Sequence, residues 1–306
     1  MQTVSEPIFV IGCPRSGTTL LSSLLGMTRY GAPFETHFIP KYYRRLSSVG
    51  DLGNAANFRR LVTAILKERP VMQMKLDVDI DDLFRQGTRD YGELVDQLCI
   101  MRNRRLGLSA WGDKTPSYIL ELDIIHRLFP NSKYIYIVRD GRDVALSLMA
   151  EAWGSNNAYS CAQYWKRCNA ANGVLDMLRQ RREIFEVRYE DLIAEPAAWL
   201  PRIYGFLEEP YDERAMVDLI GSIRPQNSNK WRRRMTPADV KTFERVASET
   251  LKRFGYEVTY EEGPIGVGRE IFYRCHDGAL TALYLLKTNT VDAVRIKYCG
   301  KEPFND

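Results

Sequence analysis

The chain has 306 residues, a net charge of +4 and 45% hydrophobic residues, a profile typical of a packed protein with one large α/β domain or two small ones. So slight a positive charge argues against a protein that binds nucleic acid by bulk charge, although it suits polyanionic ligands. The six cysteines form no CxxC pair and no set with nearby histidines. This pattern argues against zinc and against a disulfide scaffold, so we expect reduced thiols.

The N-terminal residues leave no room for a signal segment before a first strand near Pro7. No later run of about eighteen apolar residues could span a membrane. We therefore expect a cytoplasmic protein without a membrane span.

A short apolar strand over residues 8–11 leads into a loop bounded by Gly12 and Gly17, and the loop leads straight into a helix. The two glycines tolerate backbone angles that expose successive N–H groups, and the positive end of the helix dipole points to the same place. The spacing matches the Walker pattern GxxxxGK[ST], except that Thr18 replaces the lysine and Arg15 adds a cation inside the loop. A tight turn without a ligand would need no internal arginine, so the loop predicts a phosphate-binding site.

The next segment is helical over residues 38–74, with a break at 47–54, and again around 91–101. We expect this region to form a lid or an insertion. A short strand then ends at Lys114, and a helix over 119–128 follows it.

A continuous β-branched and aromatic run over residues 134–138 predicts a strand that is buried on both faces, and Arg139 follows it directly. The next helix runs through Ser147, and we interpret Arg142 and Asp143 within it as a structural ion pair. One long helix is then expected from 159 to 178, followed by a strand over 184–188 and by Tyr189.

Strands that alternate with helices predict an α/β protein with a P-loop NTPase-like three-layer sandwich, in which helical insertions surround a central parallel sheet. Ligands of such sheets gather beyond the carboxyl ends of the strands, where Arg15, Lys114, Arg139 and Tyr189 are expected. A cluster of charge, glycine and proline divides the chain into a domain over 1–262 and an extension over 263–306 packed on the same domain. The extension has a helical stretch at 279–286 and a strand-like one at 291–298, which can cover the core or pair subunits in a homo-oligomer.

Two separated motifs, GCPRSGTTLL and YIYIVRDGRDVALS, together resemble those of the sulfotransferases that use PAPS (3′-phosphoadenosine 5′-phosphosulfate). The branch with tyrosylprotein sulfotransferases and related bacterial enzymes is the most similar, over roughly residues 7 to 255. The resemblance implies O-sulfation, in which the sulfuryl group of PAPS moves to a hydroxyl of a small molecule, carbohydrate, lipid or peptide and leaves PAP. A sulfuryl group carries less negative charge than a phosphoryl group, so we expect no requirement for a metal.

The resemblance also assigns roles to individual side chains. It implies that the 5′-phosphosulfate binds at Pro14, Arg15, Ser16, Gly17, Thr18 and Thr19. It places the 3′-phosphate at Arg139 and Ser147, the adenine at Tyr189, and a further phosphate contact at Lys230. Glu35 would be the general base of an in-line transfer, with Arg15 and Lys114 stabilising the developing charge.

Several alternatives stay open at this point. His37 titrates near neutrality and is the rival base, while Glu35 can also be an ordinary acid at a helix start. An ATP-dependent P-loop kinase would need a Walker lysine and a magnesium-binding carboxylate. A non-catalytic binder of adenosine bisphosphate would need neither Glu35 nor Lys114.

Overall fold

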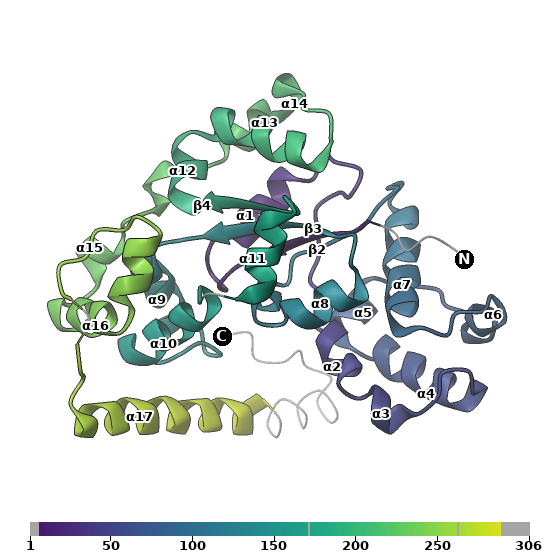
Figure 1. The fold of residues 1–306 in the computed structure, drawn as a ribbon, viewed down its shortest axis with the longest axis horizontal. Helices are drawn as coiled ribbons and strands as arrows, with labels where there is room; N and C mark the ends of the chain where they lie inside the picture. Colours follow the sequence, from purple (N-terminus) through teal and green to yellow (C-terminus); the bar gives the residue numbers. More distant parts are fainter. Residues whose placement is uncertain (1–5, 171, 262, 289–306) are drawn as a thin grey trace. The chain divides into compact units, whose positions relative to one another are not determined.

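The computed structural model describes residues 6–170, 172–261 and 263–288 (Figure 1). The chain divides into two compact units. The first unit comprises residues 6–12, 17–137 and 172–223, and the second comprises 13–16, 138–170, 224–261 and 263–288. The glycine-bounded loop is therefore shared, because its central four residues group with the second unit and its two flanks with the first.

The first unit is built on a four-stranded sheet in the order β2-β1-β3-β4 (Figure 1). The strands are β1 (Ile8–Ile11), β2 (Gly112–Asp113), β3 (Lys133–Val138) and β4 (Ile184–Arg188). β1 pairs in parallel with both β2 and β3, and all its residues are buried. The predicted α/β fold with a parallel central sheet is confirmed.

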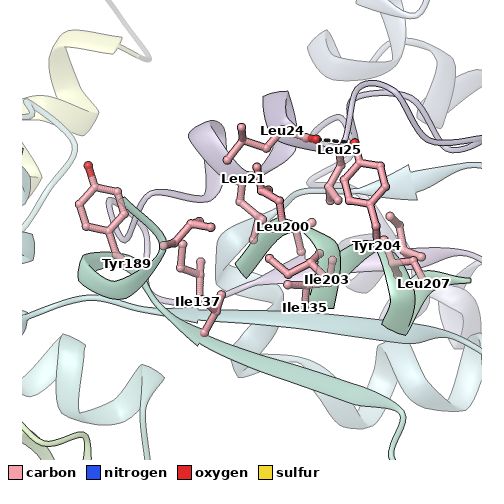
Figure 2. Close-up of a cluster of buried hydrophobic side chains, with 14 of the residues drawn as sticks. Leu21, Leu24, Leu25, Ile135, Ile137, Tyr189, Leu200, Ile203, Tyr204 and Leu207 are labelled. Atoms are coloured by element: carbon pink, nitrogen blue, oxygen red, sulfur yellow. Dashed lines mark hydrogen bonds between the residues drawn. The ribbon is translucent and has the colours of Figure 1, made fainter. Parts of the chain in front are cut away.

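One face of the sheet packs on a group of apolar helices, because alternate strand residues point to the same side (Figure 2). Ile135 and Ile137 of β3 point to this side, where the leucines of α1 (Thr18–Leu24) meet those of α13 (Pro196–Leu207). The hydroxyl of Tyr204 donates to the carbonyl of Leu24 at 2.7 Å. α12 (Tyr189–Ala194) and α14 (Glu213–Gly221) complete this layer. The helix after the loop is thereby held in the core.

The other face of the sheet carries an aromatic cluster around Phe9. Its ring centroid lies 5.8 Å from that of Trp111, 5.7 Å from that of Phe129 and 5.6 Å from that of Tyr134. The 3₁₀ helix η1 (Pro116–Leu120) packs against β1, α11 (Gly173–Gln180) packs against β4, and α8 (Leu122–Leu128) packs against both of these helices. Helices therefore lie on both faces of the sheet, as a three-layer sandwich requires.

Six helices stand between β1 and β2 in the sequence, in addition to α1, and form the predicted insertion. They are α2 (Ile39–Tyr43), α3 (Leu46–Val49), α4 (Ala55–Leu66), α5 (Arg69–Gln73), α6 (Ile80–Arg85) and α7 (Tyr91–Arg105). α4 is the clearest amphipathic helix among them, and it buries Phe58, Leu61, Val62 and Ile65. The predicted helical pattern is confirmed in part: the break at 50–54 is present, but residues 47–49 belong to α3, and shorter breaks at 44–45 and 67–68 also interrupt the pattern.

The second unit is helical. It contains α9 (Gly141–Met149), α10 (Ala158–Cys168), η2 (Pro225–Asn227), α15 (Trp231–Arg234), α16 (Pro237–Arg253) and α17 (Val267–Leu286). α10 packs on α9 and α16, and Tyr273 of α17 stacks on Tyr159 of α10 with ring centroids 5.6 Å apart. The helix expected at 279–286 is the end of α17, the stretch at 291–298 lies outside the described residues, and the boundary at residue 262 stays a prediction.

The single long helix expected from 159 to 178 is wrong. α10 ends at Cys168, and a separate helix, α11, begins at Gly173. The side chain of Asn172 caps α11 by accepting from the N–H of Val174 at 2.8 Å. An asparagine cap followed by glycine favours a new start over helix continuation, and the apolar spacing alone did not reveal it. No helix within the described ranges is long and apolar enough to cross a membrane.

Candidate active site

The second glycine of the loop packs closely against an aromatic ring. Gly17 has a φ of 96°, and a Cβ built on it would lie 2.3 Å from Cδ2 of Tyr189. A side chain at position 17 would be strained and would collide with the ring. The structure thus brings Tyr189, at the end of β4, against the loop as expected from its strand-end position. No side chain caps the first turn of α1, which begins at Thr18.

The predicted base and the predicted lysine meet in the first unit. Phe34 forms a parallel bridge with Asp113 at the end of β2, and the N–H of Lys114 donates to the carbonyl of Phe34 at 2.7 Å. This pairing places Nζ of Lys114 in contact with Oε1 of Glu35 and 3.5 Å from Oγ1 of Thr19. Three residues predicted from separate motifs therefore lie together.

Glu35 is also bound on its other side. Its Oε2 lies 2.5 Å from Nε2 of His37, and the side chains of Glu35 and His37 are 38% and 50% exposed. The alternative of an ordinary acid at a helix start is wrong, because α2 begins only at Ile39 and has no acid in its first turn. The two candidate bases are thus hydrogen-bonded partners.

A buried carboxylate fixes the segment that carries these groups. Asp113 accepts from the N–H groups of Thr36 at 3.0 Å and Thr115 at 2.6 Å, and from the hydroxyl of Thr115 at 3.2 Å. The hydroxyl of Thr36 is in turn 2.7 Å from that of Tyr118. This frame holds the backbone on both sides of Glu35, so the carboxylate is presented from a rigid support.

The surroundings of Glu35, His37 and Asp113 shift the pKa values of these three side chains in different directions. Burial raises the pKa of Glu35, but hydrogen bonds from His37 and Lys114 outweigh it and lower the pKa to about 2. The hydrogen bond with Glu35 raises the pKa of His37 above its usual 6.5. Burial raises the pKa of Asp113 to about 6, against its hydrogen bonds from Thr36 and Thr115. Such divergent pKa values are typical of functional sites.

In the second unit, Arg15 lies at the centre of a separate group. It adopts a left-handed backbone with a φ of 73°. Its Nε donates to Oγ of Ser147 at 2.8 Å, and its Nη2 lies 3.1 Å from Glu151. A non-glycine residue at such a φ is uncommon and marks a backbone held by its surroundings. The loop arginine and the predicted 3′-phosphate serine are thereby in direct contact.

Arg139 is buried, with 8% of its surface exposed, and binds the same loop. Its guanidinium donates to the carbonyls of Arg15 at 3.2 Å and Asn227 at 2.7 Å, and it lies 3.6 Å from Asp143. Asp143 also accepts from the N–H of Trp231 at 2.8 Å. Arg15, Arg139 and Ser147 are therefore brought together, and Lys230 stands one residue before the backbone contact at Trp231.

The predicted ion pair between Arg142 and Asp143 is wrong. Arg142 pairs with Asp140 at 2.7 Å and Glu244 at 2.5 Å, whereas Asp143 pairs with Arg139. Consecutive residues of a helix point to different sides, so Arg142 and Asp143 face different partners. Glu244 is also bound by the N–H groups of Thr259 and Tyr260, at 2.9 and 2.8 Å.

Three contributors escaped the sequence-based prediction. Asp113 organises the backbone around Glu35, Glu151 pairs with Arg15, and the carbonyl of Asn227 binds Arg139. Glu151 lies just after the end of α9, four residues beyond Ser147 in the sequence, so continuing the helical spacing by one turn could have suggested it. The described residues contain no group of three His, Cys, Asp or Glu side chains that could hold a metal ion. Metal-independent catalysis stays a prediction.

Comparison with known proteins agrees with this geometry. The model of a family described as the sulfotransferase family matches residues 7–213. A putative protein-tyrosine sulfotransferase of Caenorhabditis briggsae is 27% identical over 240 residues, which cover 72% of this chain and 73% of the relative. Protein-tyrosine sulfotransferase 1 of Danio rerio is 25% identical over 279 residues, which cover 82% of this chain and 72% of the relative.

Among solved structures, the sulfotransferase domain from the curacin biosynthetic pathway superposes with a TM-score of 0.56 and 24% identity. The match covers 83% of this chain and 99% of that domain, so the fold is shared. The kinase alternative is contradicted by these findings, since the family match spans most of the first unit and residues 13–16 and 138–170 of the second. The chain belongs to the sulfotransferase family and, as predicted, is an enzyme that transfers a sulfuryl group from PAPS.

Proposed function

We propose that the chain is an O-sulfotransferase in which Glu35 takes the proton of the acceptor hydroxyl. The observation that supports this role is the contact of its carboxylate with Nζ of Lys114, which also lies 3.5 Å from the hydroxyl of Thr19 in the first turn of α1. Sulfuryl transfer needs a base at the acceptor and a cation where negative charge develops. Glu35 and Lys114 supply both beside the first turn of α1, the helix that follows the loop.

The loop residues fit the donor that the family uses. Oγ of Ser16 is buried and has no hydrogen-bond partner among the described residues. A buried hydroxyl without a partner is costly, so a ligand oxygen at this position would stabilise the loop. When bound, PAPS supplies the sulfuryl group and leaves as PAP. We assign the 5′-phosphosulfate to residues 14–19, and the hydroxyl of Thr19 stays beside Nζ of Lys114.

The remaining donor contacts are assigned in the same way. Arg139 and Ser147 would bind the 3′-phosphate, and their contacts with Arg15 support a joint role. Tyr189 would contact the adenine, supported by its place against Gly17. Lys230 would reach a phosphate. Arg15 is held by Glu151, so we propose that it stabilises charge at the reacting centre after exchanging this partner.

The test is Glu35→Gln, which keeps the shape of the side chain but cannot take a proton. We expect kcat for PAPS-dependent sulfation to fall by about 10²- to 10⁴-fold. Binding of PAP, measured by titration calorimetry, should be unchanged. Glu68→Gln is the matched control, because Glu68 is another partly buried acid paired with a lysine, Lys41. Full activity of Glu35→Gln would contradict the assignment of Glu35 as the base. A wild type that binds PAP but shows no turnover would instead support the non-catalytic alternative.

We also propose that the acceptor hydroxyl is phenolic, on a small molecule or a peptide. A carboxylate with a pKa of about 2 is a weak base. A phenol, with a pKa near 10, gives up its proton far more readily than an aliphatic alcohol, whose pKa is close to the value of about 15.7 for water. The relatives named as protein-tyrosine sulfotransferases agree with this choice. Cytoplasmic location and homo-oligomer formation stay sequence-based predictions.

An acceptor panel tests this proposal directly. Phenol, a tyrosine-containing peptide and matched aliphatic alcohols are compared as acceptors at one PAPS concentration. We expect kcat/KM to favour the phenolic compounds, with the preference shrinking for more acidic alcohols. Equal or greater activity on simple aliphatic alcohols would contradict the phenolic assignment. The role of Glu35 as the base is tested separately, by Glu35→Gln.

A further inference from the structure

His37 is held in an unusual backbone conformation that faces its ring toward Glu35. Its φ is 55°, in the left-handed region that a residue with a side chain rarely adopts. The conformation is fixed from both sides, since the N–H of Phe38 donates to the carbonyl of Thr36 at 2.7 Å and the N–H of His37 lies 3.4 Å from Oγ1 of Thr115. A strained residue persists only where its surroundings determine it, and such residues cluster at functional sites.

The ring and the ammonium group hold Glu35 between them. Nε2 of His37 binds Oε2, and Nζ of Lys114 binds Oε1. The lysine is buried, with 8% of its surface exposed, whereas half of the imidazole is exposed to solvent. Of the two partners of Glu35, the imidazole is therefore the one that is open to proton exchange with water.

The charges around His37 favour its protonation. Glu35 and Asp113 raise its pKa, whereas burial and the positive charge of Lys114 lower it, and the balance lies above the usual value. Hydrogen bonds from His37 and Lys114 lower the pKa of Glu35, so its carboxylate does not retain a proton. A proton that reaches Glu35 therefore has a more basic neighbour 2.5 Å away.

We propose that His37 positions the carboxylate of Glu35. We also propose that His37 is the group that finally holds the proton of the acceptor hydroxyl. As the acceptor O–H bond breaks, its electron pair forms the new O–S bond and the bridging O–S bond of the donor breaks toward PAP. Before the transfer, His37 is neutral with its proton on Nδ1, so Nε2 carries no proton. The proton that Glu35 takes from the acceptor then lies between Oε2 and Nε2, moves to Nε2, and is later released by His37 to water. This inference rests on the proposed function.

The sign of the pH dependence follows from this sequence of transfers. His37 can accept a proton only when it is neutral, so kcat should rise as the pH increases through the pKa of His37, above 6.5. The pKa of Glu35 is too low to produce an acid limb in that range. Asp113, with a pKa of about 6, is the other group that titrates nearby.

The experiment compares kcat against pH for the wild type, His37→Gln and Asp113→Asn. Glutamine can still donate a hydrogen bond to Glu35 but cannot titrate. We expect His37→Gln to lose the acid limb and to lower the plateau kcat by about 10²-fold. KM for the acceptor and affinity for PAP should be preserved. Asp113→Asn should shift the limb but not abolish it. His276→Gln, on the exposed face of α17, is the matched control.

The outcomes separate this inference from the proposed function. If the wild type shows no PAPS-dependent sulfation of any hydroxyl, the proposed function fails. If it is active and His37→Gln keeps the acid limb, the role of His37 is overturned. A second measurement does not depend on the folding of His37→Gln: the pKa of His37 followed by NMR should match the acid limb and fall in Glu35→Gln. An unchanged pKa in Glu35→Gln would overturn the proposed coupling.

Discussion

Two clusters of three ionisable side chains in this molecule share an alternating order of acid and base but lie in opposite environments. In the second unit, Arg142 lies between Asp140 and Glu244, and all three residues are at most 3% exposed. In the first unit, Glu35 lies between Lys114 and His37, and its side chain is 38% exposed. Burial therefore determines whether such a cluster is structural or can exchange protons. The buried cluster can only hold helices together, whereas the open one can exchange a proton with solvent.

The largest expected effect comes from breaking the buried cluster. Arg142→Met would leave Asp140 and Glu244 buried without their cation, and removing one partner of a buried pair costs about 3–5 kcal/mol of unfolding free energy. The guanidinium also lies 3.7 Å from the ring centroid of Trp231, a contact that methionine cannot replace. Denaturant unfolding measures the loss.

Arg179→Met provides the surface comparison for this prediction. Arg179 pairs with Asp176 and Glu186 on the exposed side of α11 and β4. Exposed ion pairs contribute about 1 kcal/mol or less. Arg179→Met should therefore lower the free energy of unfolding several times less than Arg142→Met does. Equal losses in the two variants would mean that burial does not distinguish the clusters.

A second prediction concerns Asp113, the buried carboxylate beside the open cluster. Its pKa is raised from 3.8 to about 6 in the folded state, so protonation favours folding and stability from this group increases as pH falls from about 6 to about 4. The shift in the pKa of Asp113 corresponds to a change of about 3 kcal/mol at most in the free energy of unfolding. In Asp113→Asn this dependence should be absent. The difference in unfolding free energy between the wild type and the variant, followed from pH 4 to pH 7 by urea denaturation, isolates it. A constant difference would contradict the raised pKa.

The smallest expected effect is that of Ser147→Ala. The substitution removes the acceptor for Nε of Arg15 and one proposed ligand of the 3′-phosphate. A single hydrogen bond contributes about 1 kcal/mol, so affinity for PAP should fall about fivefold, as measured by calorimetry. Ser160→Ala on α10 is the control. An unchanged affinity would indicate that Arg15 and Arg139 bind the nucleotide without this hydroxyl.

Strand ends were predictable because apolar runs and the residues that follow them are local features. Lys114, Arg139 and Tyr189 were placed correctly on that basis. The position of Glu35 depended on resemblance, since the bridge between Phe34 and Asp113 joins segments that are distant in the sequence. The contact between Glu35 and His37 was not predictable, because it requires the left-handed backbone of His37.

The errors have similar physical causes. Glu244 on α16, which pairs with Arg142, is 102 residues away in the sequence. No local sequence pattern predicts a contact between α9 and α16. Apolar spacing continued across Asn169 and Asn172, although these asparagines separate α10 from α11. Local sequence therefore specified the elements and their ends, and tertiary packing specified which charges meet.

The contact between Gly17 and Tyr189 has a consequence for sequence evolution in this loop. The ring occupies the space that any side chain at position 17 would need, so the two positions are constrained as a pair although 171 residues separate them. Chains that keep an aromatic residue directly after the fourth strand should keep glycine at the second loop position. Where that aromatic residue is replaced by a small one, the collision is removed but the strain of the positive φ at position 17 remains, so alanine or serine should occur there only together with that replacement.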